Sequence, residues 1–399
     1  MARVDDIARA LAEEGLDGWL LYDFRLSDPL AYRILGLREE GLTTRRWFYF
    51  IATDGPPQAV VSAVEAHRLD SLPAQPRFVY RSERQMLDGL ASILHGHRRI
   101  AMNYSPRCAI PYVSRVDGGT IDLVRAFGVE IVSAADLIQT FEASLTEQQL
   151  AGHRRAATAL RDIVQESFAE ISRRVRRILP CTEYGIQRFV LERIEARGMR
   201  TDEAPIVAVN ANAANPHFST GELNDTPIQS GDLVLLDLFA KESAADSIYG
   251  DLTWMGFVGD AVPDEYSRIF AIVVRARNAA AELIQGRIRQ GITVTGAEAD
   301  QAARGVIERH GYGDYFVHRT GHSIGREVHG TGANLDSLET RDERALIERT
   351  CFSVEPGIYL PGRFGVRSEL DMTIENGCAD ISGAPAQQEI IPILSRFPS

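Results

Sequence analysis

The sequence predicts an α/β (α+β) protein of two domains, and three observations support this. Strand-like apolar runs alternate with amphipathic helical segments over the first part of the chain. From Thr146 onward, long helical patterns alternate with paired strand patterns instead. The length of 399 residues is enough for two buried cores. We therefore place the domains at residues 1–144 and 145–399.

The first domain is predicted to begin with an amphipathic helix followed by a Gly turn and an apolar strand. Further strands are separated by helices and by the Gly- and Pro-containing turn 53–57. The helices are expected at 4–15, 84–95 and 111–126, and the strands at 19–22, 47–52, 58–61 and 99–102.

The second domain is predicted from its helix caps and strand ends. Thr146 caps a helix that Pro180 ends, and Thr182 caps a second helix that ends at Gly198. Further along, an apolar strand at 233–236 is expected to form a hairpin with the segment around Asp251. A later pair of strands, 351–354 and 365–368, is expected to pair through the turn 361–364.

Composition excludes several classes of function. The chain is 45% hydrophobic and 25% charged, with a net charge of −12, which argues against a nucleic-acid partner. No segment has the roughly 20 apolar residues of a membrane span, and the acidic N-terminal segment does not resemble a secretory signal. The four cysteines are widely spaced, as free thiols of a reducing compartment would be. A cytoplasmic protein is predicted.

Five residues in the second domain are candidate metal ligands. Four carboxylates and one imidazole provide the oxygen and nitrogen ligands that a pair of divalent cations needs. Individually, an acid at a strand end can cap a turn and a lone histidine can be a core residue. Their order and local contexts favour a shared site. The five are Asp237, Asp251, His322, Glu355 and Glu369.

Local sequence explains how these residues could meet. Asp237 ends an apolar strand, and Asp251 follows fourteen residues later, so a hairpin would bring the two acids together. Facing carboxylates repel unless a cation lies between them. His322 lies between Gly321 and Gly325, where small residues permit a close backbone approach, and Glu355 directly precedes Pro-Gly.

Taken together, these motifs resemble the pita-bread-fold metallopeptidases, the prolidase, aminopeptidase P and methionine aminopeptidase group. The resemblance rests on an Asp closing a strand, Asp-x-Thr, Gly-His-x-x-Gly with a later Val-His, Glu-Pro-Gly and Val-Arg-x-Glu, and it covers most of residues 150–395. The preceding 140 or so residues resemble the extra α/β domain of the prolidase, aminopeptidase P and creatinase branch. Methionine aminopeptidases lack that domain.

The resemblance implies a centre of two divalent cations in each subunit, with Mn favoured and Zn or Co also acceptable. It implies that Asp237 chelates one cation, that Asp251 and Glu369 bridge both, and that His322 and Glu355 complete the ligand set. It also implies a homodimer, in which the N-terminal domain serves dimerisation and caps the active site.

The resemblance also implies catalytic roles. Glu355, already a ligand, would move a proton from the attacking water to the leaving nitrogen. His217 and His329 would hold the substrate carbonyl or stabilise the oxyanion, and Arg367 would orient a carboxylate ligand.

The predicted substrate is a proline-containing dipeptide or short peptide whose Xaa-Pro imide bond is hydrolysed. A dipeptidase must read the free C-terminal carboxylate, which favours arginine. The candidate substrate-binding residues are His318, Arg326, Arg46 and Trp47. The preferred activity is Xaa-Pro dipeptidase. The alternatives are an Xaa-Pro aminopeptidase, a creatinase-like C–N hydrolase, another metal-dependent enzyme such as a lyase, and a non-catalytic binding scaffold.

Four departures from the family pattern concern the surroundings of the ligands. The stretch between Asp237 and Asp251 is about three residues longer than usual. Phe239 replaces a Gly, Trp254 replaces a common Arg, and Leu370 replaces the acid that usually follows Glu369. Each ligand position itself is kept.

Overall fold

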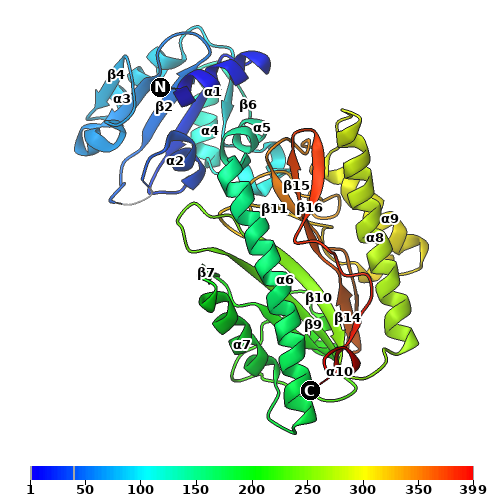
Figure 1. Ribbon diagram of the computed structural model, residues 1–399. Helices are drawn as coiled ribbons and strands as arrows, with labels where there is room; N and C mark the ends of the chain where they lie inside the picture. Colours follow the sequence, from blue (N-terminus) through cyan, green and yellow to red (C-terminus); the bar gives the residue numbers. More distant parts are fainter. Residues whose placement is uncertain (1, 39–40, 399) are drawn as a thin grey trace. The chain divides into compact units, whose positions relative to one another are not determined.

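The computed structural model describes residues 2–38 and 41–398. It divides into two compact units, Met1–Ala143 and Ser144–Ser399. Figure 1 shows both, the first unit in blue to cyan and the second in green to red.

The first unit contains a six-stranded sheet in the order β4-β3-β2-β1-β5-β6. β2 is antiparallel to its neighbours β1 and β3, whereas the β3–β4, β1–β5 and β5–β6 pairs are parallel. Five strands therefore end at the same edge. The strands are β1 (Gly18–Asp23), β2 (Trp47–Ala52), β3 (Gln58–Ser62), β4 (Arg77–Tyr80), β5 (Arg99–Met102) and β6 (Glu130–Ser133).

Helices pack on both faces of this sheet. Trp19 and Leu21 belong to a core cluster with α1, α2 and α5, whereas Leu20 and Tyr22 point to the opposite face and pack with α3 and α4. A strand buried on both faces reads as a continuous apolar run, as this one does. The helices are α1 (Ala2–Glu13), α2 (Pro29–Leu35), α3 (Glu83–Leu94), α4 (Gly118–Arg125) and α5 (Ala135–Ile138).

One predicted helix of this unit is shorter than expected. The sequence predicts a single helix over 111–126, but α4 begins only at Gly118. Asp117 is its N-cap, and its side chain accepts a hydrogen bond from the Thr120 N–H. Residues Pro111–Val113 form a separate 3₁₀ turn. The Asp117 cap therefore sets the start of the helix at Gly118, whereas hydrophobic periodicity alone placed the start at residue 111.

The second unit has two long helix pairs with strands between them, as the green and yellow helices of Figure 1 show. The helices are α6 (Glu147–Arg176), α7 (Glu183–Ala196), α8 (Asp264–Arg289), α9 (Gly296–Arg309) and α10 (Ile393–Arg396). The strands are β7 (Met199–Arg200), β8 (Ile206–Val209), β9 (Leu233–Glu242), β10 (Gly250–Phe257), β11 (Ser323–Ile324), β12 (Cys351–Val354), β13 (Gly357–Leu360), β14 (Phe364–Arg367), β15 (Leu370–Glu375), β16 (Cys378–Ser382) and β17 (Ile391–Pro392).

The alternation of side chains along β9 sets the two layers of this unit. Val234 and Leu236 pack in the core cluster that contains α6 and α7, and Leu233 and Leu235 pack in the cluster that contains α8 and α9. Asp237 is the next residue on the Leu233 and Leu235 face. The sheet path is β17-β10-β9-β7 with β8 also paired to β9, beside a β11-β12-β15-β16 sheet and a β13-β14 hairpin.

The expected pairing of 351–354 with 365–368 is wrong. The turn 361–364 joins β13 to β14, with Gly357 opposite Arg367. The strand 351–354 pairs instead with β15, with Val354 opposite Leu370. A second short strand, β13, follows Glu355 and lies nearer to the turn 361–364 than β12 does. The sequence fits either strand as the partner of β14, and only the three-dimensional structure shows which one pairs.

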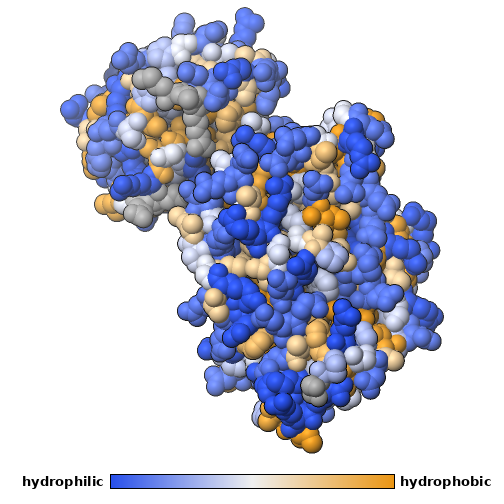
Figure 2. Space-filling model, viewed as in Figure 1, coloured by the Kyte–Doolittle hydropathy of each residue, from blue (hydrophilic) through white to orange (hydrophobic). Residues whose placement is uncertain are grey.

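Among the residues that the structure describes, no helix is both long and apolar enough to cross a membrane. The face shown in Figure 2 is mainly hydrophilic, with separate apolar patches. This agrees with the 25% of charged residues in the chain.

Candidate metal centre

The β9–β10 hairpin brings Asp237 and Asp251 to one face. Asp237 lies opposite Thr253, and Asp251 is two residues from Thr253 on the same strand, so all three side chains share a side of the sheet. Gly250 makes this placement possible, because a Cβ there would lie 2.6 Å from the Ala157 nitrogen of α6. The predicted hairpin is therefore confirmed.

His322 is placed by contact between its own segment and β12. A Cβ at Gly321 would lie 2.0 Å from the Ser353 carbonyl oxygen, so the close approach requires glycine. The His322 N–H donates to Ser353 Oγ at 3.0 Å. The His322 Nε2 then lies 3.4 Å from Glu355 Oε1 and 3.6 Å from Asp251 Oδ2.

Glu369 lies between β14 and β15 and joins the cluster through Thr253. The Thr253 hydroxyl donates to Glu369 Oε2 at 2.7 Å. One ligand atom each from Asp251, His322 and Glu369 lies within 4.8 Å of the others, and all three residues are buried. Four of the five candidate ligands are thus connected by these distances.

Arg367 connects the fifth ligand, Asp237, to the cluster. Its Nη2 hydrogen-bonds Asp237 Oδ2, and its Nε donates to Thr253 Oγ1 at 2.9 Å. Its Nε also lies 3.9 Å from Glu355 Oε2. Burial alone would lower the pKa of Arg367, but Tyr359 and the Asp237 and Glu355 carboxylates raise it well above its usual range. The guanidinium therefore stays charged among the acids.

The acids themselves are held at high electrostatic cost. Burial raises the pKa of Asp251 well above its usual range, and the Asp237 and Glu355 carboxylates raise it further. Burial and the Asp251 carboxylate have the same effect on the pKa of Glu369. Burial lowers the pKa of His322, which favours the neutral imidazole that a metal ion requires. Additional positive charge at this point would relieve the repulsion between the carboxylates.

Two unsatisfied oxygens show that the donor set fits divalent cations. Asp237 Oδ1 and Asp251 Oδ1 are buried without a hydrogen-bond partner among the described residues. Buried carboxylate oxygens are normally paired, and a hard cation is a partner of the right chemistry. With the adjacent His322 nitrogen, the cluster has the mixed oxygen and nitrogen ligation that Mn²⁺, Co²⁺ and Zn²⁺ accept.

Three further histidines differ in how the structure places them. The His329 ring centroid lies 4.4 Å from that of His322. His318 hydrogen-bonds Tyr359 Oη at 2.7 Å, and that hydroxyl accepts from Arg367 Nη1 at 3.1 Å. His217 is exposed, and it interacts electrostatically with His318 and His329. His329 thus contacts the cluster through His322, and His318 through Tyr359 and Arg367, whereas His217 interacts with these two histidines.

The remaining candidate substrate-binding residues are Arg326, Arg46 and Trp47. Arg326 forms an ion pair with Asp246 at 3.0 Å, which ties the lengthened β9–β10 loop to the histidine segment. Arg46 and Trp47 belong to the first unit. Trp47 is buried there and its Nε1 donates to Tyr32 Oη at 3.2 Å.

Three residues of this cluster are not among the predicted site residues, although Thr253 belongs to the Asp-x-Thr motif. Thr253 bridges Arg367 and Glu369, and Tyr359 accepts from Arg367. Asp371, the third, is fully buried and accepts the Asp251 N–H at 2.8 Å. Asp371 could have been found from its spacing, because it lies two residues after Glu369 and alternate residues of an extended segment share a face.

Geometry and sequence together define a metal-dependent hydrolase. The sequence pattern of metallopeptidase family M24 matches residues 114–376, and the chain belongs to that family. The expected metallopeptidase class and pita-bread fold are confirmed. Among solved structures, the dipeptidase PepE of Mycobacterium ulcerans superposes with a TM-score of 0.71 over 98% of this chain and 96% of that one, at 24% identity.

Two curated relatives illustrate the similarity in sequence. The probable dipeptidase PepE of Mycobacterium tuberculosis is 30% identical over 276 residues, which is 68% of this chain and 67% of the relative. The Xaa-Pro dipeptidase of Lactobacillus helveticus is 35% identical over 195 residues, 47% of each protein.

Proposed function

We propose that this protein hydrolyses the Xaa-Pro imide bond of dipeptides, using a centre of two divalent cations in each subunit. The observation that carries the proposal is the buried set of carboxylates whose Asp237 Oδ1 and Asp251 Oδ1 lack partners among the described residues. The names of the sequence relatives support the choice of an Xaa-Pro dipeptidase. Mn²⁺ is the favoured cation because most ligand atoms are carboxylate oxygens.

We assign the ligands from the shape of the cluster. Asp251, Glu369 and His322 would hold one part of the centre, because a ligand atom of each lies within 4.8 Å of the others, whereas Asp237 extends the cluster on the Arg367 side. Glu355 faces His322 from the end of β12. Bound divalent cations would supply the positive charge that polarises the scissile carbonyl and acidifies the attacking water.

The protein's own groups then manage the proton and the developing charge. Glu355 is only partly buried, so one carboxylate can face both the ligand cluster and the substrate space. We assign it the transfer of the proton from water to the leaving nitrogen. His329 and His217 would donate hydrogen bonds to the substrate carbonyl as it gains negative charge. Arg367 keeps Asp237 in place.

Selectivity for proline follows from the leaving group. An imide nitrogen carries no N–H, so a site that demands an N–H hydrogen bond binds it poorly. The half-buried His318, held by Tyr359, is a candidate to contact the substrate beside the catalytic cluster. Arg326 forms an ion pair with the exposed Asp246. To bind the C-terminal carboxylate of the substrate, Arg326 would have to release Asp246.

Comparing a dipeptide with a tripeptide tests this function. The metal-loaded protein should hydrolyse Ala-Pro and leave Ala-Pro-Ala largely intact. Rapid cleavage of the tripeptide alone would replace the proposal with an Xaa-Pro aminopeptidase. Inactivity towards both peptides at full metal occupancy would remove proline peptides as substrates.

A homodimer, with the N-terminal unit contributing to dimerisation and to capping of the active site, forms part of the same proposal. Light scattering of the purified chain tests it, with twice the 44.1 kDa monomer mass expected. A cytoplasmic location also stays a prediction, which cell fractionation can examine.

A further inference from the structure

We propose that the first unit contains a separate binding site for a small monocarboxylate with an apolar, ring-sized body. The site is a pocket of about 780 Å³, a volume within the range of small-molecule sites. Its lining residues include Tyr22, Phe24, Arg46, Tyr80, Asp117 and Leu123. All belong to the first unit, and none is a ligand of the candidate metal centre.

The pocket occupies the edge of the sheet where ligands bind in open α/β folds. Tyr22 lies near the end of β1 and Tyr80 ends β4, two strands that run in the same direction. The first turn of α4, at Gly119 and Thr120, forms the opposite wall. The crevice outside the carboxyl ends of parallel strands is the general ligand position of such sheets, because loops and helix starts converge there.

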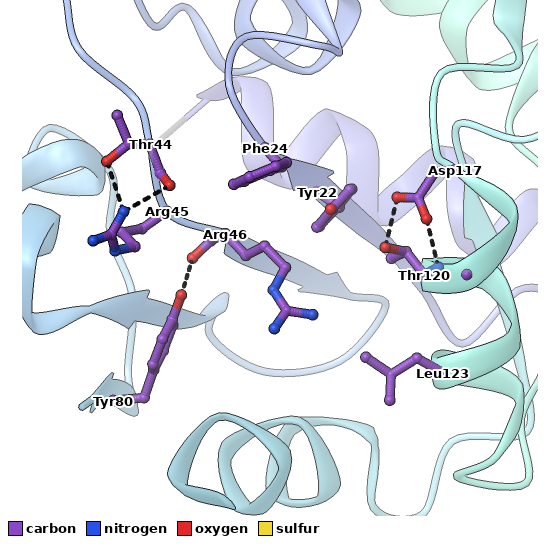
Figure 3. Close-up of a pocket in the computed structure, with 10 residues that line it drawn as sticks. Tyr22, Phe24, Thr44, Arg45, Arg46, Tyr80, Asp117, Thr120 and Leu123 are labelled. Carbon is purple, nitrogen blue, oxygen red and sulfur yellow. Dashed lines mark hydrogen bonds between the residues drawn. The ribbon is translucent and has the colours of Figure 1, made fainter. Parts of the chain in front are cut away.

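Arg46 supplies the charge for the carboxylate. Its backbone is fixed, because Tyr80 Oη donates to the Arg46 carbonyl oxygen at 2.8 Å. Its side chain extends into the middle of the pocket, between Tyr80 and Leu123, in Figure 3. Within the part of the chain that the structure describes, no hydrogen bond or ion pair of the guanidinium is found, whereas neighbouring Arg45 is bonded to Thr44. A guanidinium binds a carboxylate with two parallel hydrogen bonds.

Apolar groups of the pocket lining set the body of the ligand. Phe24 is 41% exposed, although it is a large hydrophobic residue. It lines the pocket together with Leu123 and the ring of Tyr22. Covering these surfaces would remove apolar area from water, which favours a ligand with a ring or branched chain next to its carboxylate.

The carboxylate of Asp117 disfavours phosphate, the other anion that commonly binds at such sites. Helix starts at this edge often bind phosphate through their free N–H groups. Here the Asp117 carboxylate already accepts the Thr120 N–H at 2.9 Å and the Thr120 hydroxyl at 2.7 Å. A phosphate dianion would meet a fixed negative charge instead of free donors. A monocarboxylate placed on the Arg46 side avoids that repulsion.

Titration calorimetry of the full chain with 3-phenylpropionate tests the site. A chelator-treated sample is measured beside the metal-loaded one, because carboxylates also bind metal centres. We expect the same binding in both samples and about tenfold or greater weakening by Arg46→Gln. Arg84→Gln, an exposed arginine of α3 outside the pocket lining, is the matched control and should bind like the wild type. Circular dichroism confirms that each variant is folded.

Two further probes decide the chemistry. The neutral amide 3-phenylpropanamide should bind at least tenfold more weakly than the acid, and inorganic phosphate should not compete. The affinity of Arg46→Lys for 3-phenylpropionate should lie between those of the wild type and Arg46→Gln, because lysine keeps the charge but cannot form two parallel hydrogen bonds. Equal binding of acid and amide, binding unchanged by Arg46→Gln, competition by phosphate, or no binding at millimolar ligand would each overturn the proposal.

Discussion

The backbone N–H of Asp251 donates a 2.8 Å hydrogen bond to Oδ2 of Asp371. Asp371 is not one of the candidate ligands but contacts the main chain of one of them. Its Oδ2 also lies 3.9 Å from His153 Nε2. One buried acid thus holds the main chain of another in place. Burial and the Asp251 carboxylate raise the pKa of Asp371 well above its usual range.

Replacing Asp371 should weaken metal binding without removing a ligand. Asp371→Ala leaves the Asp251 N–H without its acceptor, and we expect Mn²⁺ affinity to fall by roughly 10- to 100-fold. Asp371→Asn keeps an acceptor oxygen, so its Mn²⁺ affinity should fall much less. Calorimetric titration of Mn²⁺ into the metal-free proteins measures both. Equal affinities for the two variants would show that this hydrogen bond does not position Asp251.

Removing the proposed proton carrier should abolish turnover while leaving the fold intact. Glu355→Gln preserves the side-chain shape but cannot accept the proton, so kcat should fall by about 10²- to 10⁴-fold. Glu389→Gln, an exposed acid, is the matched control. Steady-state hydrolysis of Ala-Pro gives the comparison. Near-normal kcat for Glu355→Gln would remove this residue from the mechanism.

Arg367 should matter more for stability when metal is absent. Arg367→Met leaves the Asp237 carboxylate buried without its partner, which typically costs about 3–5 kcal/mol. Bound cations would replace part of the lost charge, so saturating Mn²⁺ should reduce that loss. Urea unfolding of the variant and the wild type, each with and without Mn²⁺, measures the difference. The same loss under both conditions would contradict a metal site beside Asp237.

Stability of the first unit should fall as pH rises through neutrality because of Asp28. Burial raises the pKa of Asp28 from 3.8 to about 7, so folding favours its protonated form. The stabilisation is complete below the unfolded pKa and is lost as pH rises through 7. Between pH 5 and 8 the loss should be about 2–3 kcal/mol.

Asp28→Asn should flatten this dependence, whereas exposed Asp54→Asn should not. Urea unfolding in a Trp254→Phe background restricts tryptophan fluorescence to Trp19 and Trp47 of the first unit. A wild-type stability that is constant or rises over this pH range would contradict the assignment.

The sequence predicts features that depend on local pattern. The hairpin carrying Asp237 and Asp251 follows from an apolar strand, a polar loop and a returning segment, and β9 and β10 have that arrangement. The Thr146 cap was equally readable, since the Thr-x-x-Gln pattern forms a capping box. At these two places one local signal determines the structure, so the sequence alone is sufficient.

Features that depend on long-range pairing were not predictable in this way. Cys351–Val354 pairs with Leu370–Glu375, although a nearer turn made 365–368 the apparent partner. Asp371 meets Asp251 across 120 positions, and no local pattern links the two. The Arg46 pocket is a similar case, because its walls come from β1, β4 and α4.

Hydrolysis of Ala-Pro before and after metal removal tests the central claim most directly. The as-purified enzyme should lose activity on chelation, and stoichiometric Mn²⁺ should restore it with close to two ions bound per chain. Hydrolysis that continues undiminished in protein shown to be free of metal would contradict a catalytic role for the cluster around Asp251 and His322.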